Sequence, residues 1–374
     1  SIKSIMNKYL ISLTVIVIVL VGAYYLLFTN PEALKVSQTP TSTTQTIRIG
    51  AFVPLSGDYA MMGESALAGA QLAVKEINDA GGVNGNSIEI VFEDDQCAKD
   101  GGVAAATKLI VINEVTAILG SICSSSSEAA STVSQVAGVP MLIAGVISPN
   151  PTKAGEYIFR ISSTAFAQGK FIAEHIYKTL NKTKVAVVYS KDEWNQALDE
   201  SFVVSFKELG GKIVYDGGLA VNAGSKEVKD AVAKIKSAKA DYIYASILPS
   251  INPFLIKELT DAKIKTPVLT VVPKFNNLDD FNNRVKDLTG KDPNLFTPLF
   301  YDAVKMLANV MGQTGTDKKS LRNSLVTILY DGGISSVIEF DDSREVKAPA
   351  FEVKNSAEAA STATASSTVS STTP

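Results

Sequence analysis

A run of four hydroxyl side chains, Ser124 to Ser127, directly follows one of the only two cysteines in the chain. That cysteine, Cys123, ends a short apolar run, and the other, Cys97, closes the acidic phrase that begins at Glu93. An apolar run followed by small polar residues predicts a strand that leads into the start of a helix. A helix start offers free N–H groups and a partial positive charge, so this point is suited to holding a carboxylate.

The same serines would also be candidate nucleophiles for a hydrolase. That chemistry needs a base, and the one histidine, His175, lies in a helical stretch with no ligand partner nearby in sequence, which favours a partly exposed helix residue over a catalytic one. No Gly-x-Ser-x-Gly phrase surrounds the serines either. We therefore expect no catalytic residue, no metal ion and no cofactor.

The N-terminal part of the chain predicts a membrane anchor. Residues 9–28 carry no charge and are rich in Ile, Val and Leu; as a helix they would span roughly 30 Å, the thickness of a bilayer core. Lys3 and Lys8 precede the run, which places the remainder of the chain outside the cytoplasm. A cleaved signal peptide is the alternative, but the run ends in bulky residues without a small-x-small site. Export is expected under both interpretations.

The composition of the rest of the chain distinguishes two Ser/Thr-rich segments from a central stretch. The net charge is −3 with Lys and Glu interspersed, so nothing indicates a nucleic-acid surface. Residues 31–46 and 354–374 are rich in Ser and Thr, which predicts a stalk and a disordered tail. The stretch between them, of about 300 residues, suits two domains of ordinary size.

Strands and helices alternate through that stretch. The first series has expected strands at 47–53, 87–92, 116–119 and 140–143, separated by helices at 63–80, 99–112 and 124–137. A second series of alternating helices and strands begins after Arg160. This alternation predicts an α/β protein with two doubly wound parallel sheets, a hinge and a central cleft. We assign residues 47–159 plus 273–330 to the first lobe and 160–272 plus 331–353 to the second.

Several phrases resemble the leucine/isoleucine/valine-binding protein family. They are the opening strand and turn, Ile49 to Gly57, the helical phrase Gly69 to Asn78, and the turn Gly81 to Gly85. Both cysteine phrases and the late helical phrase Tyr301 to Val304 fit as well. The resemblance implies the periplasmic binding protein type I fold. It also implies an extracytoplasmic solute-binding protein that delivers an amino acid or related small carboxylate to ABC permease subunits.

The resemblance assigns roles to residues of the first lobe. In the family the two cysteines form a disulfide, which implies a Cys97–Cys123 bond; two buried free thiols are the alternative. The family's serine at Ser124 takes the ligand carboxylate, although a plain N-cap would also explain a serine there. A threonine hydroxyl of the family falls at Ile147, where the adjacent Ser148 is the expected substitute.

Two positions of the second lobe bear on the ligand. Trp194 stands where the family has an aromatic residue, and a packed surface tryptophan is the alternative. Ser250 stands where the family has a glutamate that binds the ligand ammonium, and no acidic residue occurs between Asp241 and Glu258. The candidate ligand contacts are Ser124, Ser125, Gly145, Ser148, Trp194, Ser250 and Met62.

The chain is also shorter than the family in one region. Residues 267–300 lack a strand–turn–helix excursion that the family carries there, which implies a changed hinge or a reduced first lobe. Because the predicted anchor would tether the chain and the pocket residues depart from the family, a membrane-tethered ligand-sensing module of the same fold, without a transport role, is the alternative function.

Overall fold

The computed structural model describes residues 46–146, 148, 150–248, 250–335 and 337–355, together with Ile18. No helix among these residues is long and apolar enough to cross a membrane. Apart from Ile18, the anchor predicted at residues 9–28 lies outside the described part of the chain, as do most of the stalk and nearly all of the tail.

The first lobe is built on five parallel strands in the order β2–β1–β3–β4–β5. The strands are β1 (Ile47–Val53), β2 (Ile88–Asp94), β3 (Ala117–Gly120), β4 (Met141–Ile143) and β5 (Ile158–Arg160). Their side chains alternate between two cores, as the period of a strand requires. Ile49 and Leu119 face one core, whereas Phe52 and Ile118 face the other.

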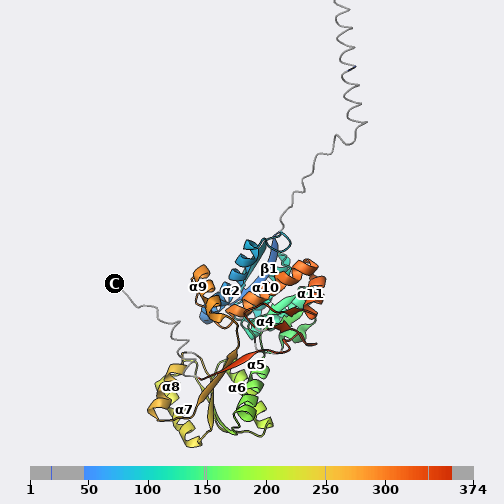
Figure 1. The fold of residues 1–374 in the computed structure, drawn as a ribbon. Helices are drawn as coiled ribbons and strands as arrows, with labels where there is room; N and C mark the ends of the chain where they lie inside the picture. Colours follow the sequence, from blue (N-terminus) through green and yellow to red (C-terminus); the bar gives the residue numbers. More distant parts are fainter. Residues whose placement is uncertain are drawn as a thin grey trace, which may run out of the picture. The chain divides into compact units, whose positions relative to one another are not determined.

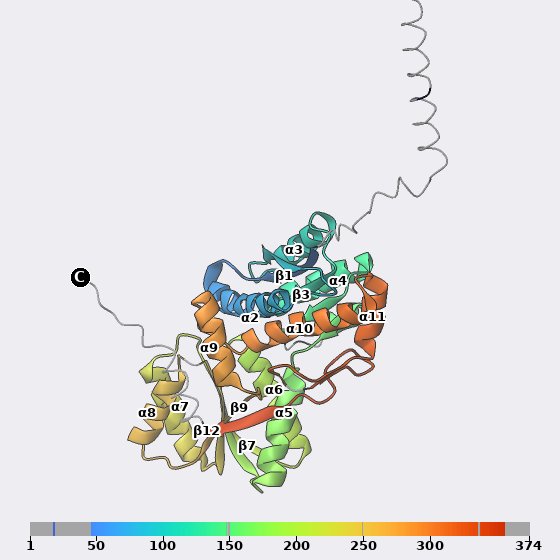
Figure 2. The same cartoon turned by 45° about the horizontal axis from the view of Figure 1, so that its top comes forward.

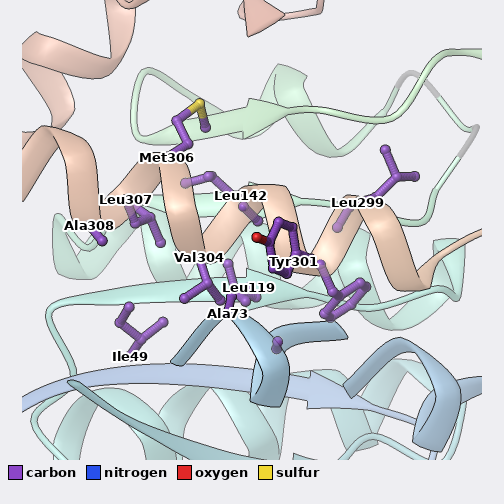
Figure 3. Close-up of a cluster of buried hydrophobic side chains, with 14 of the residues drawn as sticks. Ile49, Ala73, Leu119, Leu142, Leu299, Tyr301, Val304, Met306, Leu307 and Ala308 are labelled. Atoms are coloured by element: carbon purple, nitrogen blue, oxygen red, sulfur yellow. The ribbon is translucent and has the colours of Figure 1, made fainter. Parts of the chain in front are cut away.

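Helices cover both faces of this sheet. The face carrying Ile49 packs against α2 (Ala60–Asp79), α9 (Leu278–Thr289), α10 (Thr297–Thr314) and α11 (Lys318–Val326). Figure 1 shows the orange α10 beside the blue α2, and Figure 3 shows Leu299, Val304 and Leu307 of α10 with Ile49, Leu119 and Leu142 of the sheet. The opposite face packs against α3 (Lys99–Val111) and α4 (Ser124–Ala137). The late helices thus belong to the first lobe.

The second lobe repeats this plan with one antiparallel edge. Its strand order is β12–β9–β8–β6–β7, and only β12 runs against its neighbour. The strands are β6 (Lys184–Ser190), β7 (Lys212–Leu219), β8 (Tyr242–Ser246), β9 (Val268–Pro273) and β12 (Phe351–Asn355). The helices α5 (Ala165–Glu174) and α6 (Glu193–Glu208) cover one face, and α7 (Ser225–Ala238) and α8 (Asn252–Asp261) cover the other (Figure 2).

The chain passes between the two sheets three times, after β5, after β9 and before β12. The segment predicted at 331–353 for the second lobe divides between the lobes. Ile334, Ile338 and Phe340 are buried in the core of the first lobe, and only Phe351–Asn355 joins the second sheet. No periodic pattern in the sequence marks this division, because the paired strands β10 (Leu329–Tyr330) and β11 (Ile338–Glu339) are too short to show one.

Candidate functional site

The start of α4 presents backbone N–H groups without a side-chain cap. Cys123 is the N-cap residue, with extended backbone and no side-chain capping bond, and Ser124 is the first residue of the helix. The alternative that Ser124 itself is the N-cap is therefore wrong. Because the cap position is filled by a half-cystine, the first turn keeps its donors and its partial positive charge available to an anion.

A disulfide and a buried carboxyl fix this helix start. Cys97 and Cys123 are bonded, as the resemblance implied. The Ser125 hydroxyl donates to the carbonyl of Cys97 (3.2 Å), and the Ser126 hydroxyl donates to Asp95 (2.7 Å). Asp95 also accepts the N–H of Cys97 at 2.8 Å, and burial raises the pKa of its carboxyl despite these hydrogen bonds. Ser125, a predicted ligand contact, is thus engaged within the protein.

The loop after β4 approaches the same point. Gly145 is buried, and a Cβ placed on it would lie 2.8 Å from the Cα of Ile122, so only glycine permits this approach. Ser148 is half-buried, and its hydroxyl accepts the N–H of Asn150 at 3.4 Å. Ile147, where the family has a threonine, lies outside the described residues. The structure therefore brings the Gly145 loop to the residues that precede Ser124.

Trp194 of the second lobe contacts the first lobe. Its ring meets Phe296 edge-on, with centroids 5.7 Å apart and planes at 81°. Phe296 directly precedes α10, and the nearby Asn294 side chain donates to the carbonyl of Met62 at 3.0 Å. Trp194 and Met62, predicted separately, thus both contact one short segment of the first lobe, residues 294–296. Trp194 also lines a small cavity with residues from all three inter-lobe connections, among them Ser162, Lys274 and Pro349.

The second lobe offers little negative charge at the carboxyl ends of its strands. The loops that follow β6, β7, β8 and β9 hold one acidic residue, Asp192, and two lysines, Lys191 and Lys274. Both Asp192 oxygens are occupied by Asn195, through its backbone N–H (3.0 Å) and its side-chain amide (2.8 Å). Ser250 is exposed in the turn after β8.

Arg160 and Ser162 were missed by the sequence reasoning. Arg160 ends β5 and is fully buried, and its guanidinium donates to the carbonyl of Val146, next to Gly145, at 2.7 Å. The Ser162 hydroxyl donates to the same carbonyl at 2.8 Å. The available signal was an arginine within an otherwise apolar strand phrase, because a charge is buried only when it is paired.

A second buried charge lies away from this region, on α6. Asp199 is 5% exposed, and one of its oxygens is buried without a hydrogen-bond partner among the described residues. Burial, followed by repulsion from Asp216 and Glu200, raises the pKa of Asp199 from 3.8 to about 7. The folded protein therefore binds a proton that the unfolded chain releases above pH 4, and folding loses free energy as the pH rises toward 7.

We expect Asp199→Asn to stabilise the protein in a pH-dependent way. The gain in free energy of unfolding should be absent near pH 4, grow as the pH rises and level off above pH 7, where the buried carboxylate would be ionised. Urea unfolding of both chains at pH 5 and pH 8 measures it. Glu208→Gln, an exposed acid-to-amide change at the end of the same helix and not among the charges that shift the pKa of Asp199, is the matched control. An equal gain at both pH values would contradict the assignment.

Comparison with known proteins places the chain among binding proteins. Residues 46–277, which are 232 of the 374 residues, match the Periplasmic binding protein family. The chain belongs to this family. The "Amino acid binding protein" of Pseudomonas aeruginosa is 32% identical over 235 residues, which are 61% of this chain and 62% of that protein. The "Leucine-specific-binding protein" of Salmonella typhimurium is 30% identical over 213 residues, 57% of this chain and 56% of that protein.

Each of these alignments therefore spans less than two thirds of the curated relative. A Leu/Ile/Val-binding protein of Escherichia coli, 29% identical over 199 residues, covers 53% of each chain and confirms the predicted resemblance. Two solved structures, of a substrate-binding and a solute-binding protein, confirm the fold. The branched-chain amino acid transporter substrate-binding protein of Streptococcus pneumoniae, in complex with isoleucine, has a TM-score of 0.69 at 23% identity, over 83% of this chain and 97% of that one. A solute-binding protein of Rhodopseudomonas palustris, in complex with 3,4-dihydroxybenzoic acid, has a TM-score of 0.69 at 19% identity, over 83% and 93%.

Proposed function

We propose that this protein is the extracytoplasmic solute-binding component of an ABC transporter, and that it binds an amino acid or related small carboxylate between its two lobes. The observation that carries the proposal is the uncapped start of α4, where Ser124 follows a half-cystine and no side chain of the described residues caps the N–H groups of the first turn. Oriented N–H groups at a helix start favour a carboxylate. The relatives named for amino acid binding support the same class of ligand.

Binding would involve no covalent chemistry. The ligand carboxylate would sit at Ser124 and the Gly145 loop, with Trp194 and Met62 as apolar contacts. Closure of the lobes about their three connections would then bury the ligand, and the closed protein would deliver it to the permease. We further infer that residues 9–28 tether the protein to the membrane, because their uncharged length matches a bilayer core.

The charges of the second lobe favour a ligand without a free ammonium group. A buried ammonium needs a counter-charge. The acid of the strand-end loops, Asp192, already accepts two hydrogen bonds from Asn195, and Ser250 replaces the family's glutamate. Glu193, exposed at the start of α6, directly follows Asp192. Carboxylates that lack an amine, of which the benzoates bound by structural neighbours are examples, therefore fit these charges better than amino acids.

Ser124→Ala is expected to weaken ligand binding about tenfold or more, because a hydrogen bond to a charged group contributes roughly 1.5–3 kcal/mol. The free energy of unfolding should change far less. Calorimetry with leucine, valine and benzoate measures binding, and urea unfolding measures stability. Ser125→Ala is the matched control, since the Ser125 hydroxyl donates to the carbonyl of Cys97. Equal binding by Ser124→Ala and the parent protein would remove the carboxylate assignment.

A further inference from the structure

The buried guanidinium of Arg160 lies between two parts of the chain that are far apart in sequence. On one side it donates to the carbonyl of Val146 (2.7 Å), in the loop that carries Gly145 and Ser148. On the other side its Nε lies 2.6 Å from a carboxylate oxygen of Glu345. Glu345 belongs to the third connection between the lobes, which leads to β12.

The third connection is held firmly against β5 at this point. The backbones of Arg160 and Glu345 form an isolated parallel β-bridge, and the backbone N–H of Arg160 donates to the carbonyl of Arg344 at 2.9 Å. The Thr152 hydroxyl donates to the other Glu345 oxygen at 2.7 Å. The Arg344 guanidinium donates back to the carbonyls of Ile158 (3.1 Å) and Thr152 (2.9 Å). Movement of residue 345 therefore cannot leave Arg160 in place.

The Val146 carbonyl accepts a second hydrogen bond besides the one from Arg160. Ser162, the second residue of the first inter-lobe connection, donates its hydroxyl to the same Val146 carbonyl at 2.8 Å. Arg160 has no exposed surface and Ser162 is 4% exposed, so neither side chain has free space in which to absorb a displacement. Two of the three connections between the lobes thus act on one carbonyl of the ligand loop.

We propose that Arg160 and Ser162 are positioning residues that couple the ligand loop at Val146 to the inter-lobe connections, the third of them through Glu345. The displacement of the connections that accompanies lobe closure is passed to the Val146 peptide, and ordering of that loop by a ligand favours the same arrangement of the connections. The importance of the loop for a ligand rests on the proposed function. The coupling itself is a property of the protein without ligand.

Amide hydrogen exchange on the full chain, without ligand, tests the coupling. Gly145 and Val146 are buried, so their amides exchange only when the loop opens. We expect Glu345→Gln and Ser162→Ala each to speed exchange at both amides about tenfold, while Ile49 and Leu119 in the core keep their rates. Glu345→Gln is the decisive variant, because residue 345 is distant from the loop in sequence and reaches the Val146 carbonyl through Arg160. Thr152→Val, which removes the other side-chain contact of Glu345, controls for a route through Thr152 and should leave both amides unchanged.

Two controls match the variants. Ser134 is also buried and donates its hydroxyl to a backbone carbonyl, that of Val139, at 2.8 Å. Asp302 is a buried acid that holds the N–H of Ile334 at 2.8 Å. Ser134→Ala and Asp302→Asn should leave Gly145 and Val146 within about twofold of the parent rate. Unchanged exchange at these two amides in Glu345→Gln, or the same acceleration in the controls or the core, would overturn the proposal.

A second measurement separates this proposal from the proposed function. The same variants are titrated with leucine and with benzoate. Faster amide exchange at Gly145 and Val146 together with weaker binding of a probe supports both the coupling and the proposed function. Faster exchange in a protein that binds neither probe supports the coupling and counts against the proposed ligand class, whereas slower opening or no change counts against the coupling whatever binds.

Discussion

Replacing Cys97 and Cys123 together by alanine is expected to lower the free energy of unfolding by about 3.5 kcal/mol. The bond closes a loop with a sequence separation of 26, and chain entropy gives about that value for a loop of this length. The loss should fall on the first lobe, because the bond joins the end of β2 to the start of α4. Urea unfolding followed by a probe in each lobe measures it.

Reduction supplies the control for this prediction. Treating the parent protein with a thiol reductant should lower its stability to that of the double variant, and should leave the variant unchanged. Ligand binding by the folded variant should fall less than it falls in Ser124→Ala. A variant as stable as the oxidised parent would show that the bond contributes no constraint to the lobe.

Arg160→Met is expected to cost about 3–5 kcal/mol, the range for removing one partner of a buried ion pair. Glu345 would keep the hydroxyl of Thr152 but lose the guanidinium, and the carbonyl of Val146 would lose one of its two donors. Substituting both partners, as Arg160→Met with Glu345→Met, should recover much of the loss because no unpaired charge remains. Urea unfolding of the parent, the two single variants and the double variant measures the coupling between them.

The loss in Arg160→Met should depend on pH. Burial raises the pKa of Glu345, and Arg160 opposes that effect in the parent protein. Without Arg160 the folded chain holds the proton of Glu345 to a higher pH than the unfolded chain does. The variant is therefore destabilised most at pH 8 and least near pH 4, where the carboxyl is protonated in both states. A loss of equal size at both pH values would contradict a charge-based origin.

Much of the fold follows from local patterns. Apolar strand phrases such as 47–53 and glycine-terminated helices such as 63–80 predicted the first sheet, and the repeat after Arg160 predicted the second. The helix start at Ser124 followed from the apolar run before it and the small polar residues after it. These features depend on residues close together in sequence, where periodicity and turn chemistry act directly. The disulfide followed from family resemblance alone.

Contacts between distant segments were not predictable in this way. The pairing of Arg160 with Glu345 joins residues 185 positions apart, and the contact of Trp194 with Phe296 joins the two lobes. Neither contact produces a periodic pattern in the sequence. The same holds for Ile334 and Ile338, which pack in the first lobe although the chain next enters the second sheet. The identity of the cap residue at α4 depended on backbone geometry that a run of Cys and Ser does not specify.

The central claim is that the uncapped α4 start binds the carboxylate of a small ligand that needs no ammonium group. Calorimetric titration of the full chain with leucine, 4-methylpentanoate, benzoate and 3-methylbutylamine tests it most directly, because the first two share a side chain and the last lacks a carboxylate. We predict that 4-methylpentanoate or benzoate binds at least as tightly as leucine, that the amine does not bind, and that Ser124→Ala weakens the carboxylates while Glu193→Gln does not. Binding of the amine, tight binding of leucine that Glu193→Gln abolishes, or no binding by any carboxylate would contradict the claim.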